Sequence, residues 1–310
     1  MLMHVLIADA LAATPEFAEA LRLQTHDVQL TYWQRDPPPP TADVLAAWTL
    51  PDDMHQLPEG LKAVFCFGAG AGHLLTDSRI AEHLPVVRNL DHGQAEQMLD
   101  YALHAVLARQ LDDQRLLEAQ RLGVWDKPKQ ARRPRGDLKV TVLGHGHIGR
   151  HVSAGISAYG FRVTSWTLRS GEPVPGLIRG RENIVQACDG ADVVINVLPP
   201  LPGTEDILSE RLISCLAGGS YLTNIGRGQH LDESTLIAAL DSGHLGAAWL
   251  DTFRREPLPQ DHPFWRHPKV RVTPHVGGLP TVTGSAKALA NVLDALRTGA
   301  PLPGLLKNLI

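Results

Sequence analysis

Short apolar runs alternate with longer amphipathic stretches along most of this chain. Runs rich in Val, Ile, Leu and aromatic residues are typical of buried strands. Their alternation with helical stretches predicts a parallel sheet with helices on both faces. In the first hundred residues the runs lie at His4–Ala8, Val28–Tyr32, Val44–Trp48, Ala63–Phe67 and Val86–Arg88.

Two stretches in this region have the spacing of helices. Thr14–Leu23 begins with a good helix-capping residue, and Pro15 suits the first helical position. Asp91–Leu122 predicts one long helix that bridges two domains, because apolar residues recur on one face. The residues on this face are Met98, Tyr101, Ala102, Ala105 and Leu111. The run Pro37–Pro40 predicts a surface loop, since proline excludes helix and inner strand.

A second series of strands and helices follows and predicts a Rossmann domain. We therefore expect an α/β protein with two Rossmann-like or flavodoxin-like domains, parallel sheets and a cleft between them. The helical stretch Ala286–Gly299 and the tail are too short for a third domain, so residues 285–310 should complete a first domain of residues 1–98. Residues 99–284 form the predicted dinucleotide-binding domain. Its strand candidates are Leu138–Leu143, Arg162–Trp166, Val193–Leu198, Tyr221–Ile225, Ala247–Leu250 and Val270–Thr273.

The first of these strands runs directly into a G-x-G-x-x-G loop that precedes a helical stretch, Arg150–Tyr159. This is the context of a dinucleotide fingerprint. Gly144 permits a tight turn, Gly146 lets the backbone approach a pyrophosphate, and Gly149 lets the helix pack closely on the strand. The positions between them, His145, His147 and Ile148, contribute backbone amides to the same loop.

The tip of the next strand carries Thr167, Leu168, Arg169 and Ser170, and the nearest carboxylate is Glu172. An acidic residue at this tip would bind a ribose 2′-hydroxyl, whereas an arginine suits a 2′-phosphate. We therefore expect a preference for NADP(H), with NAD(H) possible. The alternative is that Arg169 is a surface arginine and Thr167 caps a turn.

Composition excludes several classes of protein. With 310 residues, 44% of them hydrophobic and 20% charged, the chain is long enough for two globular domains. A net charge of −4 argues against a nucleic-acid partner, and no run reaches the ~20 apolar residues of a membrane helix. The distant cysteines Cys66, Cys188 and Cys215 predict reduced thiols in a cytoplasmic protein.

Two clusters of polar residues have competing interpretations. Arg132, Arg133 and Arg135 form either a solvated loop or a phosphate-related patch. His145 and His147 have the spacing of paired metal ligands, but no third ligand lies nearby in the sequence, so we expect no bound metal.

Three later segments place a polar residue just after a predicted strand: Arg227, Glu256 and His275. Ligands of open α/β sheets bind beyond the carboxyl ends of the strands, so these residues can converge near a nicotinamide. Each has a structural alternative. Arg227 could be a surface arginine, Glu256 could pair with Arg254 or Arg255, and His275 could be a turn histidine.

With these motifs in order along nearly its whole length, the chain resembles the D-2-hydroxyacid dehydrogenases. The similarity is greatest to the bacterial glyoxylate/hydroxypyruvate reductases of the A type. The motifs are Gly144–Gly149, Asn224–Gly228, Asp251 with Glu256-Pro257-Leu258, and Pro274-His275, with further echoes at Ala47-Trp48, Gly68-Ala69-Gly70, Glu96-Gln97-Met98, Leu198-Pro199 and Pro263–Pro268.

The resemblance implies reduction of a small 2-keto acid to a D-2-hydroxy acid by a homodimer. His275 would donate the proton, Glu256 would fix the histidine tautomer and favour the imidazolium, and Arg227 would bind the keto and carboxylate oxygens. Asp251 would lie near the nicotinamide. The other cofactor contacts implied are Leu198, Pro199, Thr204, Ile225, Gly226 and Gly277.

In the first domain the resemblance implies that the loop of Ala69 and Gly70 takes the substrate carboxylate through backbone amides. Trp48 would line the substrate site and Arg88 would add a positive charge. A simple glycine turn and a core tryptophan are the structural alternatives. The rival functions are a dehydrogenase of a bulkier 2-keto acid and a catalytically idle, NAD(P)H-sensing protein of the corepressor type.

Overall fold

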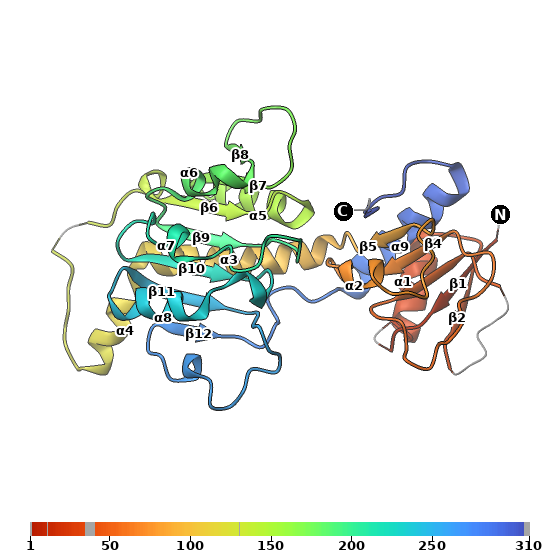
Figure 1. Cartoon of the computed structure of the whole chain (residues 1–310), viewed down its shortest axis with the longest axis horizontal. Coiled ribbons are helices and arrows are strands. Elements are labelled where there is room, and N and C mark those ends of the chain that lie inside the picture. Colours follow the sequence, from red (N-terminus) through yellow and green to blue (C-terminus); the bar gives the residue numbers. More distant parts are fainter. Residues whose placement is uncertain (1, 11, 35–40, 130, 307–310) are drawn as a thin grey trace. The chain divides into compact units, whose positions relative to one another are not determined.

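The structure is a computed structural model that describes residues 2–10, 12–34, 41–129 and 131–306. The loop expected at Pro37–Pro40 lies outside the described residues. The chain divides into two compact units (Figure 1). Unit 1 comprises Met1–Gln94 with Pro280–Ile310, and unit 2 comprises Ala95–Leu279.

Unit 1 contains a parallel sheet of strand order β2-β1-β3-β4-β5. Its strands agree with the predicted runs to within one residue at each end. Trp48 and Phe67, the last residues of two predicted runs, lie one residue beyond the ends of the observed strands. The strands are β1 (Met3–Ile7), β2 (Val28–Tyr32), β3 (Val44–Ala47), β4 (Ala63–Cys66) and β5 (Val86–Arg88).

Two helices pack against one face of this sheet. Helix α1 (Pro15–Gln24) begins as predicted, because Thr14 Oγ1 accepts a hydrogen bond from the Phe17 amide at 3.2 Å. Helix α9 (Val282–Thr298) ends at Gly299, which has a φ of 71°. Phe17 and Leu21 of α1 share a core with Leu289 and Leu293 of α9 and with the sheet. The short helix α2 (Gly72–Leu75) covers the other face, through Leu74.

Unit 2 contains a parallel sheet of order β12-β11-β10-β9-β6-β7-β8, the strand order of a Rossmann domain extended by one strand. These two parallel sheets confirm the predicted α/β class. The sequence did not predict β8, because three residues give no clear periodicity. The strands are β6 (Lys139–Leu143), β7 (Arg162–Thr167), β8 (Leu177–Arg179), β9 (Val193–Asn196), β10 (Ser220–Asn224), β11 (Leu245–Leu250) and β12 (Val270–Val272).

Helices cover both faces of this sheet (Figure 1). On one face α3 (His92–Leu111) and α5 (His147–Ala158) pack on β6, β9 and β11 through residues such as Ala102 and Ile156. On the other face lie α6 (Ile184–Cys188), α7 (Glu210–Ile213) and α8 (Glu233–Asp241). Short 3-10 turns lie at η1 (Arg135–Asp137), η2 (Arg181–Asn183), η3 (Gly228–His230) and η4 (Pro263–Trp265).

The prediction of one continuous helix over Asp91–Leu122 is wrong. The chain turns at Asp112, which adopts a left-handed φ of 58°, and a separate helix α4 (Asp113–Arg121) follows. Aspartate tolerates this conformation better than most residues. Helix α4 buries no side chain, and Leu111 is 40% exposed, so the apolar face of α3 ends before the turn.

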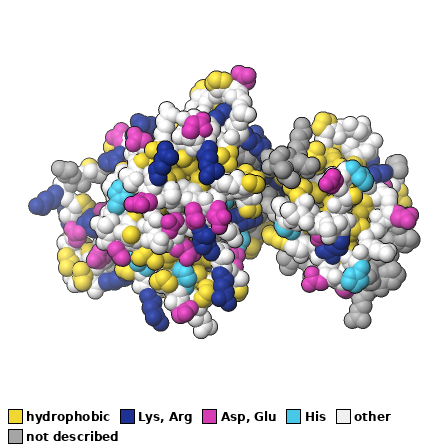
Figure 2. Space-filling view, in the orientation of Figure 1, with side chains coloured by type: hydrophobic (Ala, Val, Ile, Leu, Met, Phe, Trp, Pro, Cys, Tyr) yellow, Lys and Arg dark blue, Asp and Glu magenta, His cyan; other side chains and the backbone are white. Residues whose placement is uncertain are grey.

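The basic segment before β6 has a structural role. Arg133 donates to both carboxylate oxygens of the buried Asp192, at 2.6 and 3.2 Å. Acidic and basic side chains are interspersed over the face drawn in Figure 2. Among the described residues, no helix is both long and apolar enough to cross a membrane.

Candidate active site

The carboxyl ends of the unit 2 strands all lie along one edge of the sheet, because the strands are parallel. The strand order therefore fixes the order of the loops along that edge. His275 follows β12, Glu256 and Asp251 follow β11, Arg227 follows β10 and Leu198 follows β9. The glycine loop follows β6, and Arg169 follows β7. The three candidate catalytic side chains thus come from three adjacent strands.

The glycine loop has the packing that its sequence predicts. Gly144 has a φ of +115°, and its amide donates to the Trp166 carbonyl at 2.8 Å. A Cβ added to Gly149 would lie 1.9 Å from the Gly144 carbonyl oxygen. Any side chain there would push α5 away from β6, so both glycines are needed for the close approach of helix and strand.

The start of α5 fits a pyrophosphate. Gly146 is the N-cap and contributes no side-chain cap, and the first turn contains no acidic residue. The amides of this turn and the positive end of the helix dipole are suited to an anion. His145 beside them is held toward its neutral form, since burial lowers its pKa and the charges of Arg150 and Arg179 lower it further.

The tip of β7 combines one buried and three less buried residues. Thr167 is buried, and its hydroxyl accepts from the Arg169 amide at 3.3 Å, so it does cap the turn. Leu168 is half-buried, while Arg169 and Ser170 are exposed.

The loop after β10, which carries Arg227, is held by the buried side-chain amides of Asn196 and Asn224. Asn196 Nδ2 donates to Asn224 Oδ1 at 2.8 Å and to His230 Nδ1 at 2.9 Å. Asn224 Nδ2 in turn donates to the Arg227 carbonyl at 3.0 Å. Because His230 Nδ1 accepts, its ring is neutral with the proton on Nε2. Burial and the charge of Arg227 lower the pKa of His230 to about 4.

The same network reaches the neighbouring cofactor loop. The Leu198 amide donates to Asn196 Oδ1 at 3.2 Å. A Cβ on Gly226 would lie 2.8 Å from Asn196 Nδ2 and 2.9 Å from the Leu198 carbonyl oxygen. The predicted cofactor residues Leu198, Ile225 and Gly226 are thus brought together in space, with Pro199 beside them. Thr204 lies nearby but is buried, and its hydroxyl donates to the Leu201 carbonyl at 2.7 Å.

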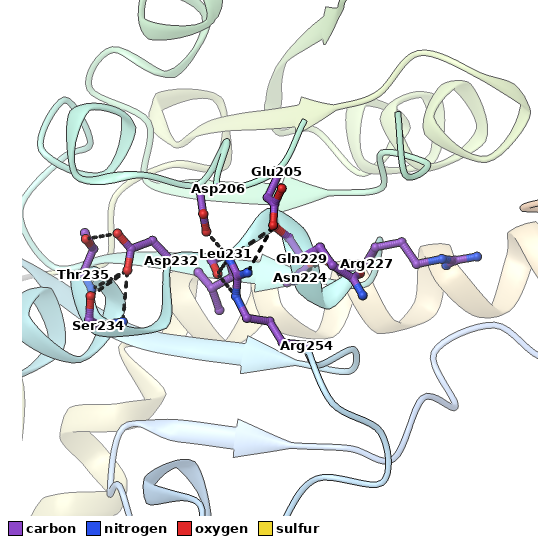
Figure 3. Close-up of polar contacts among 10 residues, drawn as sticks. All are labelled: Glu205, Asp206, Asn224, Arg227, Gln229, Leu231, Asp232, Ser234, Thr235 and Arg254. Atoms are coloured by element: carbon purple, nitrogen blue, oxygen red, sulfur yellow. Dashed lines mark hydrogen bonds and ion pairs between the residues drawn. The ribbon is translucent and has the colours of Figure 1, made fainter. Parts of the chain in front are cut away.

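Arg254 links the segments that contain Leu231 and Asp206. Its guanidinium donates to the Leu231 carbonyl at 2.8 Å and forms an ion pair with Asp206 (Figure 3). In Figure 3 the Arg227 side chain extends away from this cluster. Arg254 therefore does not pair with Glu256, in contrast to the structural alternative considered for that carboxylate.

Glu256 instead pairs with His275. Glu256 Oε2 lies 2.8 Å from His275 Nδ1, and Glu256 Oε1 accepts from the Phe253 amide at 2.9 Å. Both carboxylate oxygens are therefore engaged, which fixes the rotamer of Glu256 and the orientation of the imidazole. His275 has a left-handed φ of 55°, and its side chain is 43% exposed.

A buried carboxylate holds the loop of His275. Asp251 accepts from Thr273 Oγ1 at 2.6 Å, from the Val276 amide at 2.9 Å and from the Gly277 amide at 2.8 Å. Its carbonyl accepts from the His275 amide at 2.9 Å. Tyr101 OH lies 2.8 Å from Thr273 Oγ1. Since the Thr273 proton is donated to Asp251, Tyr101 is the donor to Thr273.

The unit 1 candidates also follow adjacent strands. Trp48 follows β3, Ala69 and Gly70 follow β4, and Arg88 ends β5. Trp48 is 37% exposed, and a Cβ on Gly68 would lie 3.4 Å from its ring. The partial exposure of Trp48 argues against the core alternative. His73 Nε2 lies 2.7 Å from the Trp48 carbonyl oxygen.

Sequence reasoning missed the residues that hold these loops. Asn196, His230 and Tyr101 lack a motif of their own. A strand-end polar residue in an apolar run was a usable signal for Asn196, but the partners of His230 and Tyr101 are far away in the sequence. The described residues contain no cluster of three or more His, Cys, Asp or Glu placed to hold a metal.

Fold and site together define a dinucleotide-binding oxidoreductase with a histidine–carboxylate pair. Comparison with known proteins identifies the group. Residues 102–277 match the D-isomer specific 2-hydroxyacid dehydrogenase, NAD binding domain. A glyoxylate/hydroxypyruvate reductase A of Serratia proteamaculans is 36% identical over 304 residues, which is 95% of each chain. One from Yersinia enterocolitica is 32% identical over 314 residues and 98% of each chain.

Solved structures agree. A D-isomer specific 2-hydroxyacid dehydrogenase of Xanthobacter autotrophicus Py2, in complex with NADPH and MES, has a TM-score of 0.90 at 26% identity, covering 99% of this chain and 98% of its own. An NADPH-dependent glyoxylate/hydroxypyruvate reductase of Sinorhizobium meliloti, with NADP and sulfate, has a TM-score of 0.84 at 25% identity, covering 98% of both chains. This chain belongs to the D-isomer specific 2-hydroxyacid dehydrogenase family and is an NAD(P)-dependent enzyme of that class.

Proposed function

We propose that this enzyme is an NADP(H)-preferring reductase of small 2-keto acids of the glyoxylate and hydroxypyruvate type, forming D-2-hydroxy acids. The observation that carries the proposal is the pair of His275 Nδ1 and Glu256 Oε2 at 2.8 Å, with Glu256 itself fixed by the Phe253 amide. A histidine held in this way is suited to proton transfer at its other nitrogen.

In the proposed reaction the glycine loop and the start of α5 would hold a dinucleotide whose nicotinamide would provide the hydride for the keto carbon. His275 Nε2 gives its proton to the keto oxygen, so the C=O double bond becomes an alcohol. Glu256 stabilises the imidazolium before transfer and keeps Nδ1 protonated after it. Because the His275 side chain is 43% exposed, water can return the proton once product leaves.

Arg227 orients the substrate in this proposal. A guanidinium can donate to a carboxylate oxygen and to the keto oxygen from one planar group, which polarises the carbonyl and fixes the face presented to the hydride. The buried amides of Asn196 and Asn224 hold the backbone of this arginine in place. In unit 1 we assign the substrate carboxylate to the amides of Ala69 and Gly70, which follow β4. Trp48 follows β3 and Arg88 ends β5, the two strands that flank β4 in the sheet.

The cofactor preference is supported by the tip of β7 and by the relatives. Arg169 lies exposed at this tip, where an acidic residue would disfavour a 2′-phosphate. The two structural relatives above were solved with NADPH and with NADP. The glycine loop, α5 and the loop of Asp251 and Gly277 supply the remaining cofactor contacts that we propose.

Steady-state consumption of NADPH and of NADH with a panel of 2-keto acids tests the proposal. We expect the highest kcat/KM with glyoxylate or hydroxypyruvate and NADPH. Higher kcat/KM with branched or aromatic keto acids would instead favour the dehydrogenase of bulkier substrates. Tight NADPH binding without turnover of any 2-keto acid would favour the sensing protein. Light scattering of the purified enzyme tests the homodimer predicted from the resemblance.

A further inference from the structure

Arg179, the last residue of β8, holds the loop that follows β7. It is paired in register with Thr167, the last residue of β7. Its Nε donates to the Glu172 carbonyl at 3.1 Å, and its Nη1 donates to the Arg169 carbonyl at 3.1 Å and the Ser170 carbonyl at 3.5 Å. One guanidinium therefore spans the backbone of residues 169–172.

The loop lies in close contact with this guanidinium. Gly171 has a φ of +151°, and a Cβ on it would lie 3.2 Å from Arg179 Nη1 and 3.3 Å from Cζ. The short loop after β7 thus folds around the side chain of Arg179. Replacing Arg179 would therefore remove hydrogen bonds from the backbone of Arg169 and Ser170, the residues of the strand tip.

The hydrogen bonds of Arg179 are made to backbone carbonyls, which do not neutralise its charge. Within the described part of the chain, no Asp or Glu oxygen forms an ion pair with Arg179 or Arg169, although arginines elsewhere do so. The paired arginines include Arg79, Arg115, Arg133, Arg254, Arg271 and Arg297.

The positive charge of Arg179 also reaches the glycine loop. Together with Arg150 it lowers the pKa of His145, after the larger effect of burial. The tip of β7 therefore lies between two guanidinium groups, Arg179 on β8 and Arg169 in the β7–β8 loop, and Arg179 acts together with Arg150 of α5 on the adjoining glycine loop. Such positive charge favours a multiply charged anion over a neutral hydroxyl.

We propose that Arg179 is a second selectivity residue, which binds the phosphate on the 2′-oxygen of the adenosine ribose together with Arg169. The proposal rests on the proposed preference for NADP(H). A phosphate monoester carries close to two negative charges at neutral pH. One arginine neutralises half of that charge, so a second guanidinium at the same strand tip adds strongly to the discrimination.

Calorimetric binding of two nucleotides isolates this contribution. Adenosine 2′,5′-bisphosphate carries the 2′-phosphate, and 5′-AMP lacks it, while neither requires turnover. We compare wild type with Arg179→Gln and Arg169→Gln. Arg162→Gln serves as the matched control, because Arg162 is an exposed residue at the opposite end of β7.

We expect Arg179→Gln to weaken binding of the bisphosphate by about 10- to 100-fold and to leave 5′-AMP within about twofold. The KM for NADPH should rise while that for NADH stays the same. Arg162→Gln should change neither ligand. Arg179→Lys keeps the charge but loses the planar fork, and should weaken the bisphosphate by several-fold, so it tests the proposal even if the glutamine variant does not fold.

Two results would overturn the role of Arg179. Equal weakening of both nucleotides would mean that Arg179 supports the fold of the nucleotide site as a whole and does not select the 2′-phosphate. Unchanged binding of the bisphosphate in both Arg179 variants would remove it from the site. Failure of the NADP(H) preference itself is seen separately, since wild type would then bind the two nucleotides equally.

Discussion

The two ends of the functional edge of unit 2 are built differently. At the end formed by β9 to β12, the loops rest on polar side chains that are nearly inaccessible: Asn196, Asn224, His230 and Asp251 are each at most 2% exposed. At the end formed by β7 and β8, Arg169 and Ser170 are exposed, and one arginine holds the loop.

This difference separates the requirements of chemistry from those of selectivity. Proton and hydride transfer need groups fixed to a fraction of an ångström, and buried, fully hydrogen-bonded networks supply that rigidity. Recognition of one phosphate needs charge more than exact placement, and an exposed loop can provide it. Mutations at the first end should therefore reduce the rate or the stability, whereas those at the second should change the choice of cofactor.

Replacement of His275 by Ala should have the largest effect. Loss of a general acid lowers kcat by about 10²- to 10⁴-fold. The dissociation constant for NADPH, measured by fluorescence titration, should stay within about threefold, since the pocket for the cofactor remains. Glu256→Gln keeps the shape but removes the charge, and should give a smaller loss. Near-normal kcat in His275→Ala would contradict the role of proton donor.

Asn196→Ala should be the next most damaging change. It leaves His230 Nδ1 buried without its donor and the Leu198 amide without its acceptor, and each unsatisfied group costs about 1–3 kcal/mol, while Asn224 Oδ1 keeps the Gly226 amide at 3.3 Å. Denaturant unfolding should show this loss, and kcat should fall with it because the backbone at Arg227 is released. Asn291→Ala, on an exposed position of α9, is the matched control and should change stability by less than about 0.5 kcal/mol. A stable, fully active Asn196→Ala enzyme would show that the network is dispensable.

The sequence points to the proposed catalytic residues more readily than to the buried side chains that hold them. Arg227, Glu256 and His275 could be proposed because each stands in a motif just after a strand. His230 and Tyr101 could not, since their roles depend on hydrogen bonds to Asn196 and Thr273, which lie far away in the chain. The local hydrophobic pattern also predicted most strands. It did not predict the turn at Asp112, because the helical spacing of apolar residues continues through that position.

The burial of His230 predicts a pH dependence of stability. Its pKa is lowered to about 4 in the folded state, from the ordinary histidine value of 6.5, so the unfolded chain binds more protons below pH 6.5. Stability should therefore be highest above that pH and fall as the pH is lowered toward 4. At about pH 5 the loss from this group is about 2 kcal/mol relative to neutral pH.

Denaturant unfolding of wild type and of His230→Gln, at about pH 5 and at neutral pH, measures the contribution of His230 to this loss of stability. The glutamine cannot titrate, so its stability should change less between the two conditions. His244→Gln leaves His230 in place and should keep the wild-type dependence. An identical pH dependence in wild type and His230→Gln would mean that His230 is not held neutral by the fold.

Thr273→Val should have the smallest effect, and it tests whether the rigidity of the first end matters beyond stability. Valine keeps the shape but interrupts the chain from Tyr101 through Thr273 to Asp251, leaving three of the four hydrogen bonds that tie Asp251 to this loop. Two hydrogen bonds are lost, and the one at Asp251, worth about 1 kcal/mol, should lower kcat by about fivefold if its loss moves His275. Thr273→Ser restores the hydroxyl and should recover the rate. If Thr273→Val lost stability but kept kcat, the chain would support the fold alone, and the contrast between the two ends would concern packing more than catalysis.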